Sequence, residues 1–184
     1  MFERAKELAS RFFGQDTPRR RAHELYVAVA EAARRPEFYA DLDVPDTPEG
    51  RYDLLSLHVI MVLRRLKTEK QGTAKFAQLL FDVMFRDVDD TLREMGVGDL
   101  KVGKKVREYA EAFFGRALAY EKALDGEEPL ETALGRNVYG DPEAPAAPRL
   151  ADYVRRADAA LDAQPISDIM SGQVHFPPVQ NTEE

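Results

Sequence analysis

The chain contains no cysteine and no tryptophan among its 184 residues. Disulfide bonds and thiolate chemistry are therefore excluded as sources of stability or activity. Histidine is also scarce, because only His23, His58 and His175 occur, and none of them stands in a His-Glu-x-x-His or Glu-x-x-His pattern. Zinc hydrolases and di-iron helical bundles depend on such patterns. We therefore predict no catalytic residue, no metal site and no cofactor.

Long hydrophobic runs are missing as well. The most apolar stretch extends only from Leu54 to Leu63, whereas a membrane-spanning helix needs about 20 apolar residues. The first residues, Met1 to Leu8, lack the apolar core of a secretory signal. The formal net charge is −7, so direct binding to nucleic acid is not expected. The apolar stretch is instead predicted to be a buried core helix.

Apolar residues recur at helical spacing along the chain, and no useful stretch alternates as a strand does. Two helix starts are marked by Thr17-Pro18 and Thr47-Pro48, each a capping threonine followed by proline in the first turn. The fold class predicted is all-α, a single-domain irregular helical bundle of about six to eight helices. We assign residues 1–172 to this domain and expect residues 173–184 to be a mobile C-terminal tail.

The expected helices alternate with breaks at glycine and proline. The segment from Tyr52 to Leu66 is apolar nearly all round, which predicts a place at the centre of the bundle. Short helical turns are expected around residues 37–42 and from Pro165. The longer helices are expected over residues 2–13, 18–33 and 48–66, between Gly72 and Gly96, and over 102–124, 129–140 and 150–161.

Two motifs come close to known chemistry and fail at identifiable positions. Asp89-Asp90 resembles the Asp-Asp-x-x-Asp motif of prenyl-chain synthases, but Arg93 occupies the place of the third carboxylate. Ion pairs with Arg93 explain this acidic run more simply. The glycine-rich segment from Gly96 to Lys105 lacks the Ser or Thr of a phosphate-binding loop and follows a helix. Phosphate or phospholipid binding at this basic corner remains an alternative to a plain solvated turn.

Several spaced blocks resemble one family, the ubiquinol–cytochrome c chaperones. Any single block would be a weak signal, but the blocks occur in the same order and together cover roughly residues 22–140. The blocks are Tyr52–His58, Arg64–Leu66, Phe81–Asp90, Leu92–Leu100, Val102–Lys105, Phe113–Ala117 and Leu134–Asn137.

This resemblance implies a non-catalytic assembly factor for respiratory complex III, whose partners are cytochrome b or another assembly protein. The high proportion of Arg over Lys and the many alanines suggest a bacterial member of the family. We therefore expect a cytoplasmic protein in peripheral contact with the inner membrane.

Aromatic and methionine side chains on the central helices exceed what one buried stripe needs. Phe81, Met84, Phe85, Phe113 and Phe114 could line a groove that receives an amphipathic or membrane helix, although all five could equally be core residues. The residues predicted to bind a partner are His58, Arg65, Phe81, Asp82, Phe85, Asp87, Asp89, Lys104, Lys105, Phe114 and Arg116.

Two other readings stay open. The chain could be a lipid- or small-ligand-binding bundle, or an enzyme, whose pocket is formed by His58, Asp82, Asp87 and Lys104. His58 could instead be a satisfied core histidine on its apolar helix. A third possibility is a peripheral membrane module that uses the first helix and the basic clusters.

Overall fold

The structure is a computed structural model that describes residues 17–69 and 72–180. Of these residues 74% are helical and none lies in a strand, which confirms the all-α prediction. The helix expected over residues 2–13 lies outside the described residues. The elements in chain order are α2 (Pro18–Ala33), α3 (Glu37–Ala40), α4 (Pro48–Thr68), α5 (Ala74–Glu94), α6 (Asp99–Leu124), α7 (Leu130–Leu134), the π-helical turn η1 (Gly135–Tyr139), α8 (Ala147–Ala163) and α9 (Ile166–Met170).

Both threonine-proline pairs begin helices, as predicted. The Thr17 side chain accepts a hydrogen bond from the Arg20 backbone N–H at 3.3 Å, and Thr47 accepts one from the Gly50 N–H at 3.1 Å. Each bond satisfies a donor that the helix itself leaves free. Gly50 is required here, because a Cβ would lie 2.0 Å from the Pro45 carbonyl oxygen. The chain thus folds back tightly onto the first turn of α4.

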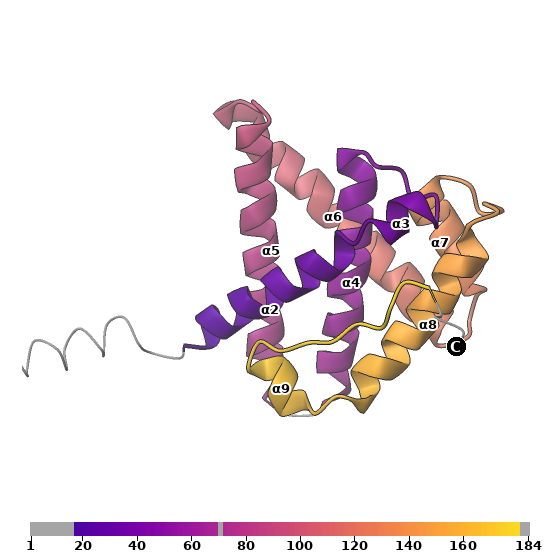
Figure 1. The fold of residues 1–184 in the computed structure, drawn as a ribbon. Coiled ribbons are helices and arrows are strands. Elements are labelled where there is room, and N and C mark those ends of the chain that lie inside the picture. Colours follow the sequence, from indigo (N-terminus) through magenta and orange to yellow (C-terminus); the bar gives the residue numbers. More distant parts are fainter. Residues whose placement is uncertain (1–16, 70–71, 181–184) are drawn as a thin grey trace, which may run out of the picture.

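Helix α4 is the centre of the bundle, as its apolar sequence predicts. It packs against α2, α5, α6, α8 and η1, and Figure 1 shows α2 crossing both α4 and α5. Leu54, Leu57 and Leu66 of α4 are completely buried. Among the helices of the described residues, none has the length and hydropathy needed to cross a membrane.

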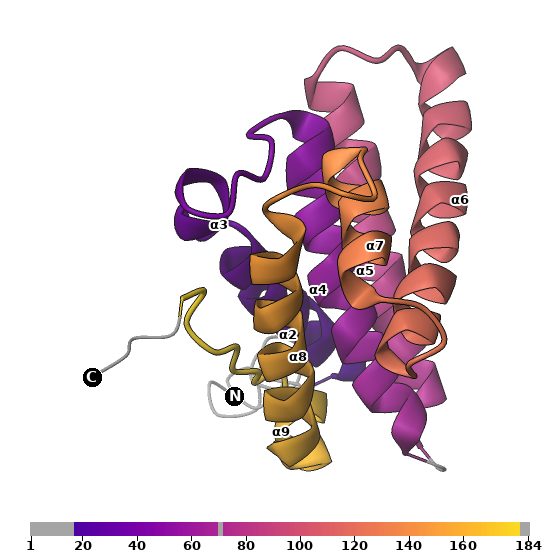
Figure 2. The ribbon, with the colours of Figure 1, turned by 90° about the vertical axis from the view of Figure 1, so that its right-hand side faces the viewer.

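Helices α5 and α6 form a long antiparallel hairpin. Facing aromatic rings pack along its length, with Phe81 beside Phe114 and Phe85 beside Phe113. Helix α5 ends at Glu94, and Gly96 follows with a φ of 85°, in the left-handed region that favours glycine. The connection between the two helices projects beyond the rest of the bundle in both views of the fold (Figure 1 and Figure 2).

The C-terminal segment was expected to be mobile from residue 173 onward, but its described part packs against the domain. From α9 it runs back across the bundle toward α8 (Figure 1). Phe176 and Val179 are buried. Arg35 donates a hydrogen bond to the Pro177 carbonyl at 2.6 Å, and Arg156 donates one to the Val179 carbonyl at 2.9 Å. Residues 173–180 therefore belong to the folded domain, because two apolar anchors and two arginines tie their backbone down.

Candidate partner-binding site

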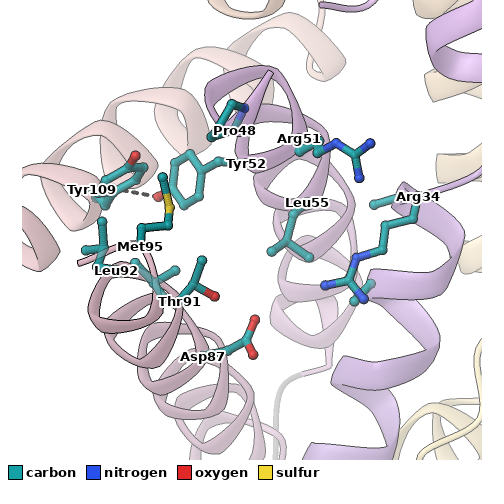
Figure 3. A pocket seen from close by; sticks show the side chains of 13 residues that line it. Arg34, Pro48, Arg51, Tyr52, Leu55, Asp87, Thr91, Leu92, Met95 and Tyr109 are labelled. Carbon is teal, nitrogen blue, oxygen red and sulfur yellow. Dashed lines mark hydrogen bonds between the residues drawn. The ribbon is translucent and has the colours of Figure 1, made fainter. Parts of the chain in front are cut away.

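An open cavity of about 310 Å³ lies between α2, α4, α5 and α6 (Figure 3). The C-terminal halves of α2 and α5 and the first turns of α4 form most of its walls, and α6 contributes Tyr109. Small side chains create the space, because Ala30 and Ala33 of α2 stand where larger residues would fill it. The remaining lining residues are Arg34, Pro48, Arg51, Tyr52, Leu55, Asp87, Val88, Thr91, Leu92, Met95 and Tyr109.

Two tyrosines close one end of the cavity. The Tyr52 hydroxyl donates a hydrogen bond to the Tyr109 backbone carbonyl at 2.7 Å, and the two rings meet edge to face with centroids 4.5 Å apart. Burial raises the pKa of Tyr52 to about 12. The hydroxyl therefore stays protonated at neutral pH, and this end presents ring surface rather than charge.

The charged groups of the cavity lie at its edges. Asp87 points into the space from α5, opposite Arg34 and Arg51 (Figure 3). Its carboxylate accepts a hydrogen bond from the Tyr26 hydroxyl at 2.5 Å. Burial and this carboxylate both raise the pKa of Tyr26. Asp87 is thus held in place by a neutral donor.

The two arginines differ in their availability. Arg51 pairs with Asp46 at 2.7 Å and lies over the Tyr39 ring at 5.4 Å. Arg34 is exposed and forms no ion pair within residues 17–69 and 72–180. An apolar cavity with the exposed Arg34 at its rim suits an apolar segment that carries a polar or acidic group nearby.

The five aromatic and methionine residues predicted to line a groove lie elsewhere. Met84 and Phe113 are fully buried core residues. Phe81, Phe85 and Phe114 pack together on the α5–α6 hairpin, with Phe81 stacked on Phe114 at 5.4 Å between centroids. Only Phe114 is largely exposed, at 59%. The set forms an interhelical aromatic cluster, and none of its members lines the cavity.

His58 is a core histidine. Its Nδ1 lies 2.8 Å from the Leu54 carbonyl and its Nε2 lies 2.8 Å from the Tyr153 hydroxyl. A carbonyl only accepts, so Nδ1 carries the proton and Nε2 accepts from Tyr153. Rings of Phe38 and Phe176 enclose the imidazole edge-on. Burial lowers the pKa of His58 to about 4. As placed, this side chain does not face a partner.

The pocket suggested for an enzyme or lipid-binding protein is not assembled. His58 is buried between α4 and α8, whereas Asp82 is exposed and accepts a hydrogen bond from Gln78 at 2.7 Å. Lys104 is 82% exposed near the end of the hairpin. Asp87 alone of the four lines the cavity. The side chains point to separate parts of the molecule, so they cannot act on one ligand.

The other predicted residues make structural pairs. Arg65 donates to the Leu161 and Gln164 carbonyls at 3.0 and 3.2 Å and so ties α4 to the end of α8. Asp89 pairs with Arg93 at 2.6 Å, as the sequence suggested. Lys104 and Lys105 both lie within reach of Glu108. Within the described residues, no group of three or more potential metal ligands gathers closely enough to hold an ion.

Arg116 forms a pair with a more buried partner. Its guanidinium lies 2.6 Å from the Asp53 carboxylate across α6 and α4. Burial raises the pKa of Asp53 to about 6, and Arg116 opposes this rise. The pair flanks the cavity through the neighbouring Tyr52, whose ring lies 5.9 Å from the Arg116 guanidinium.

Sequence reasoning missed most of the cavity. Tyr52, Leu55 and Tyr109 belong to ordinary apolar stripes, and membership in a stripe does not distinguish a cavity wall from a core contact. Arg34 has the charge of a candidate, but it follows the last turn of α2 among other surface arginines. Ala30 and Ala33 contribute to the cavity because their small side chains leave space unfilled. No sequence motif marks such positions.

Comparison with known proteins decides the family. The family described as Ubiquinol-cytochrome C chaperone matches residues 40–176. The chain belongs to this family. The match extends past the region recognised in the sequence, because it includes α8 and α9. The resemblance predicted from the blocks is therefore confirmed.

Other family proteins agree over most of the chain. A crystal structure of the Cbp3 homolog from Brucella abortus is similar with a TM-score of 0.79 and 35% identity, over 97% of this chain and 98% of that one. The Ubiquinol-cytochrome-c reductase complex assembly factor 1 of Xenopus laevis is 26% identical over 86% of this chain and 81% of its own length. The mouse protein of that name is 27% identical, but the match spans only 55% of its length.

Proposed function

We propose that this chain is a non-catalytic assembly factor for respiratory complex III. Its membership of the chaperone family supports this role, and the vertebrate relatives carry the name of ubiquinol–cytochrome c reductase assembly factors. At the cavity, Asp87 is held by the Tyr26 hydroxyl, and His58 is enclosed in the core away from it. A role in binding rather than turnover fits these groups.

The finer proposal is that the cavity binds cytochrome b or a protein that assembles with it. The observation that carries this proposal is the open apolar space between α2, α4, α5 and α6, with the exposed Arg34 at its rim. Apolar side chains of a partner helix fit such a space, because an amphipathic helix can bury its apolar face in a groove between helices. We further propose that the protein works in the bacterial cytoplasm, at the inner membrane.

The experiment places a photo-crosslinking amino acid at Thr91, which is exposed and lines the cavity. The matched control carries the same group at Ala159, an exposed position on α8. In respiring cells we expect crosslinks to cytochrome b or an assembly partner from Thr91 and not from Ala159.

A second pair of variants tests the need for the cavity. Thr91→Phe fills it from an exposed position and should lower the level of assembled complex III, whereas Ala159→Phe should leave it unchanged. Equal crosslinking from both positions, or normal complex III in the Thr91→Phe strain, would count against the cavity as the binding site. A normal level of assembled complex III after deletion of the whole gene would refute the proposed function itself.

A further inference from the structure

The projecting end of the α5–α6 hairpin has a composition unlike the rest of the chain. Residues 93–107 contain five basic side chains and two acidic ones, a net charge of +3 within a chain whose total is −7. We call these fifteen residues the hairpin tip. They include the end of α5, the connection through Gly96 and Gly98, and the first turns of α6.

The hairpin tip also exposes apolar side chains. Leu100 is 101% exposed and Met95 is 59% exposed. Their neighbours Leu92 and Val102 are buried and hold the end of the hairpin together. Leu100 therefore contributes nothing to the packing of the tip. Single exposed leucines are common, so the argument depends on what surrounds this one.

The basic residues of the tip are exposed around these apolar groups. Lys101 and Arg107 form no ion pair within the described part of the chain, and Lys104 and Lys105 share a single partner, Glu108. Of the two acidic residues in the tip, Asp99 pairs with Arg93. Available positive charge therefore exceeds negative charge on this surface.

We propose that the hairpin tip binds the surface of an anionic lipid bilayer. Leu100 and Met95 enter the interface between headgroups and acyl chains, and the lysines contact the headgroup phosphates while their aliphatic stems follow the apolar layer. Two observations favour lipid over an acidic protein. The tip projects beyond the rest of the bundle in both views (Figure 1 and Figure 2), and Leu100 is fully exposed and does not line the cavity.

This contact between the hairpin tip and lipid would hold the cavity close to the bilayer surface. Met95 belongs both to the tip and to the cavity lining, so the cavity opens close to the end that meets the lipid. A membrane-protein client could then pass from the bilayer surface to the cavity without crossing open water. For this point alone the inference rests on the proposed function.

The first experiment measures binding of the full chain to phosphatidylcholine vesicles with and without phosphatidylglycerol. We expect binding to the anionic vesicles alone, and its loss in high salt. Lys104→Gln/Lys105→Gln should bind about thirtyfold more weakly, because each lysine at such a surface contributes severalfold. The matched control is Lys75→Gln/Lys122→Gln, which removes the same charge from α5 and α6 away from the tip and should bind like the unaltered chain.

The second experiment uses the absence of tryptophan from the chain. Leu100→Trp places the only indole at a fully exposed position, and its emission should shift to the blue on anionic vesicles. Leu118→Trp, at a 57% exposed position further along α6, should not shift. No preference for anionic vesicles, equal losses in both lysine pairs, or an unshifted Leu100→Trp emission would each overturn the proposal. Vesicles contain no client, so failed crosslinking at Thr91 with intact vesicle binding would count only against the proposed function.

Discussion

Helix α4 has two apolar sides that differ in packing: one is part of the closed core, and the other borders an open cavity. Toward α8, the rings of Phe38, Tyr153 and Phe176 surround the buried His58. Toward α2 and α5, Ala30 and Ala33 face the helix and an open cavity remains. Both sides are apolar, so hydrophobicity alone does not separate core from binding surface. The volume of the facing side chains makes the difference.

The largest loss of stability should come from removing a large side chain on the side of α4 that faces α8. Phe38 is completely buried, so Phe38→Ala should lower the free energy of unfolding by about 3–5 kcal/mol. Leu55→Ala removes a half-buried side chain that already borders an open space, so it should cost about 1 kcal/mol. Urea denaturation of both variants measures the contrast, and equal losses would show that the cavity side is packed as tightly as the core.

Acid should act with opposite sign on two buried titratable groups of α4, His58 and Asp53. His58 has a folded-state pKa of about 4, below its ordinary 6.5, so the unfolded chain binds more protons between these values. Its contribution is complete above pH 6.5 and falls by about 3 kcal/mol as the pH drops to 4. Asp53 has a folded-state pKa of about 6, above 3.8. The folded chain therefore binds more protons in that window, and the contribution of Asp53 falls as the pH rises from 3.8 to 6.

The opposing slopes can be separated by substitution. Asp53→Asn should make stability rise more steeply between pH 4 and pH 6, because the opposing slope of Asp53 is then removed. In His58→Gln, stability should instead fall between pH 4 and pH 6, because the slope of Asp53 is no longer opposed by that of His58. His23→Gln, at an exposed position on α2, is the control and should follow the unaltered chain. Thermal unfolding at several pH values provides the measurement, and a steeper rise in the His58→Gln variant would contradict the assignment.

A smaller loss of stability is expected when one hydrogen bond is removed between α4 and α8. Tyr153→Phe deletes the hydroxyl that donates to His58 Nε2 at 2.8 Å and leaves a buried acceptor unsatisfied, at a cost of about 1–3 kcal/mol. Tyr139→Phe is a partner for comparison, since its hydroxyl donates to the Leu42 carbonyl at 2.8 Å in a less buried place. The stability loss should be larger for Tyr153→Phe; the reverse order would show that the His58 bond contributes little.

The smallest effect is expected on client binding, when a charge is removed from the rim of the cavity. Arg34→Gln removes a cation without an ion-pair partner in the described residues, so binding of the client should weaken by about 1 kcal/mol, or roughly fivefold. Arg51→Gln should matter less for binding, because Arg51 is already paired with Asp46. The yield of crosslinks from Thr91 in each background provides the comparison. A greater loss from Arg51→Gln would mean that its pair with Asp46 opens when the client binds.

The helices were predictable because their signals are local. Thr17-Pro18 and Thr47-Pro48 marked two helix starts, and the all-round apolar character of α4 predicted its central place. The buried state of His58 was one of two readings that its apolar helix allowed. The packing of the C-terminal segment was not predictable, because Phe176 and Val179 flank two prolines and carry no local signal for the surface that they meet. Arg35 and Arg156, which are distant in the sequence, hold the backbone of this segment by hydrogen bonds.

By itself, the sequence determined the helical class, the helix boundaries marked by capping residues, and the family, because spacing, caps and ordered blocks are properties of neighbouring residues. It also carried the basic and apolar composition of the hairpin tip. Only the tertiary structure decided where α4 borders empty space, that the aromatic set forms a cluster instead of a groove, and that Met95 joins the tip to the cavity. These features depend on which side chains from distant segments meet, and therefore on volumes across helix interfaces rather than on any local pattern.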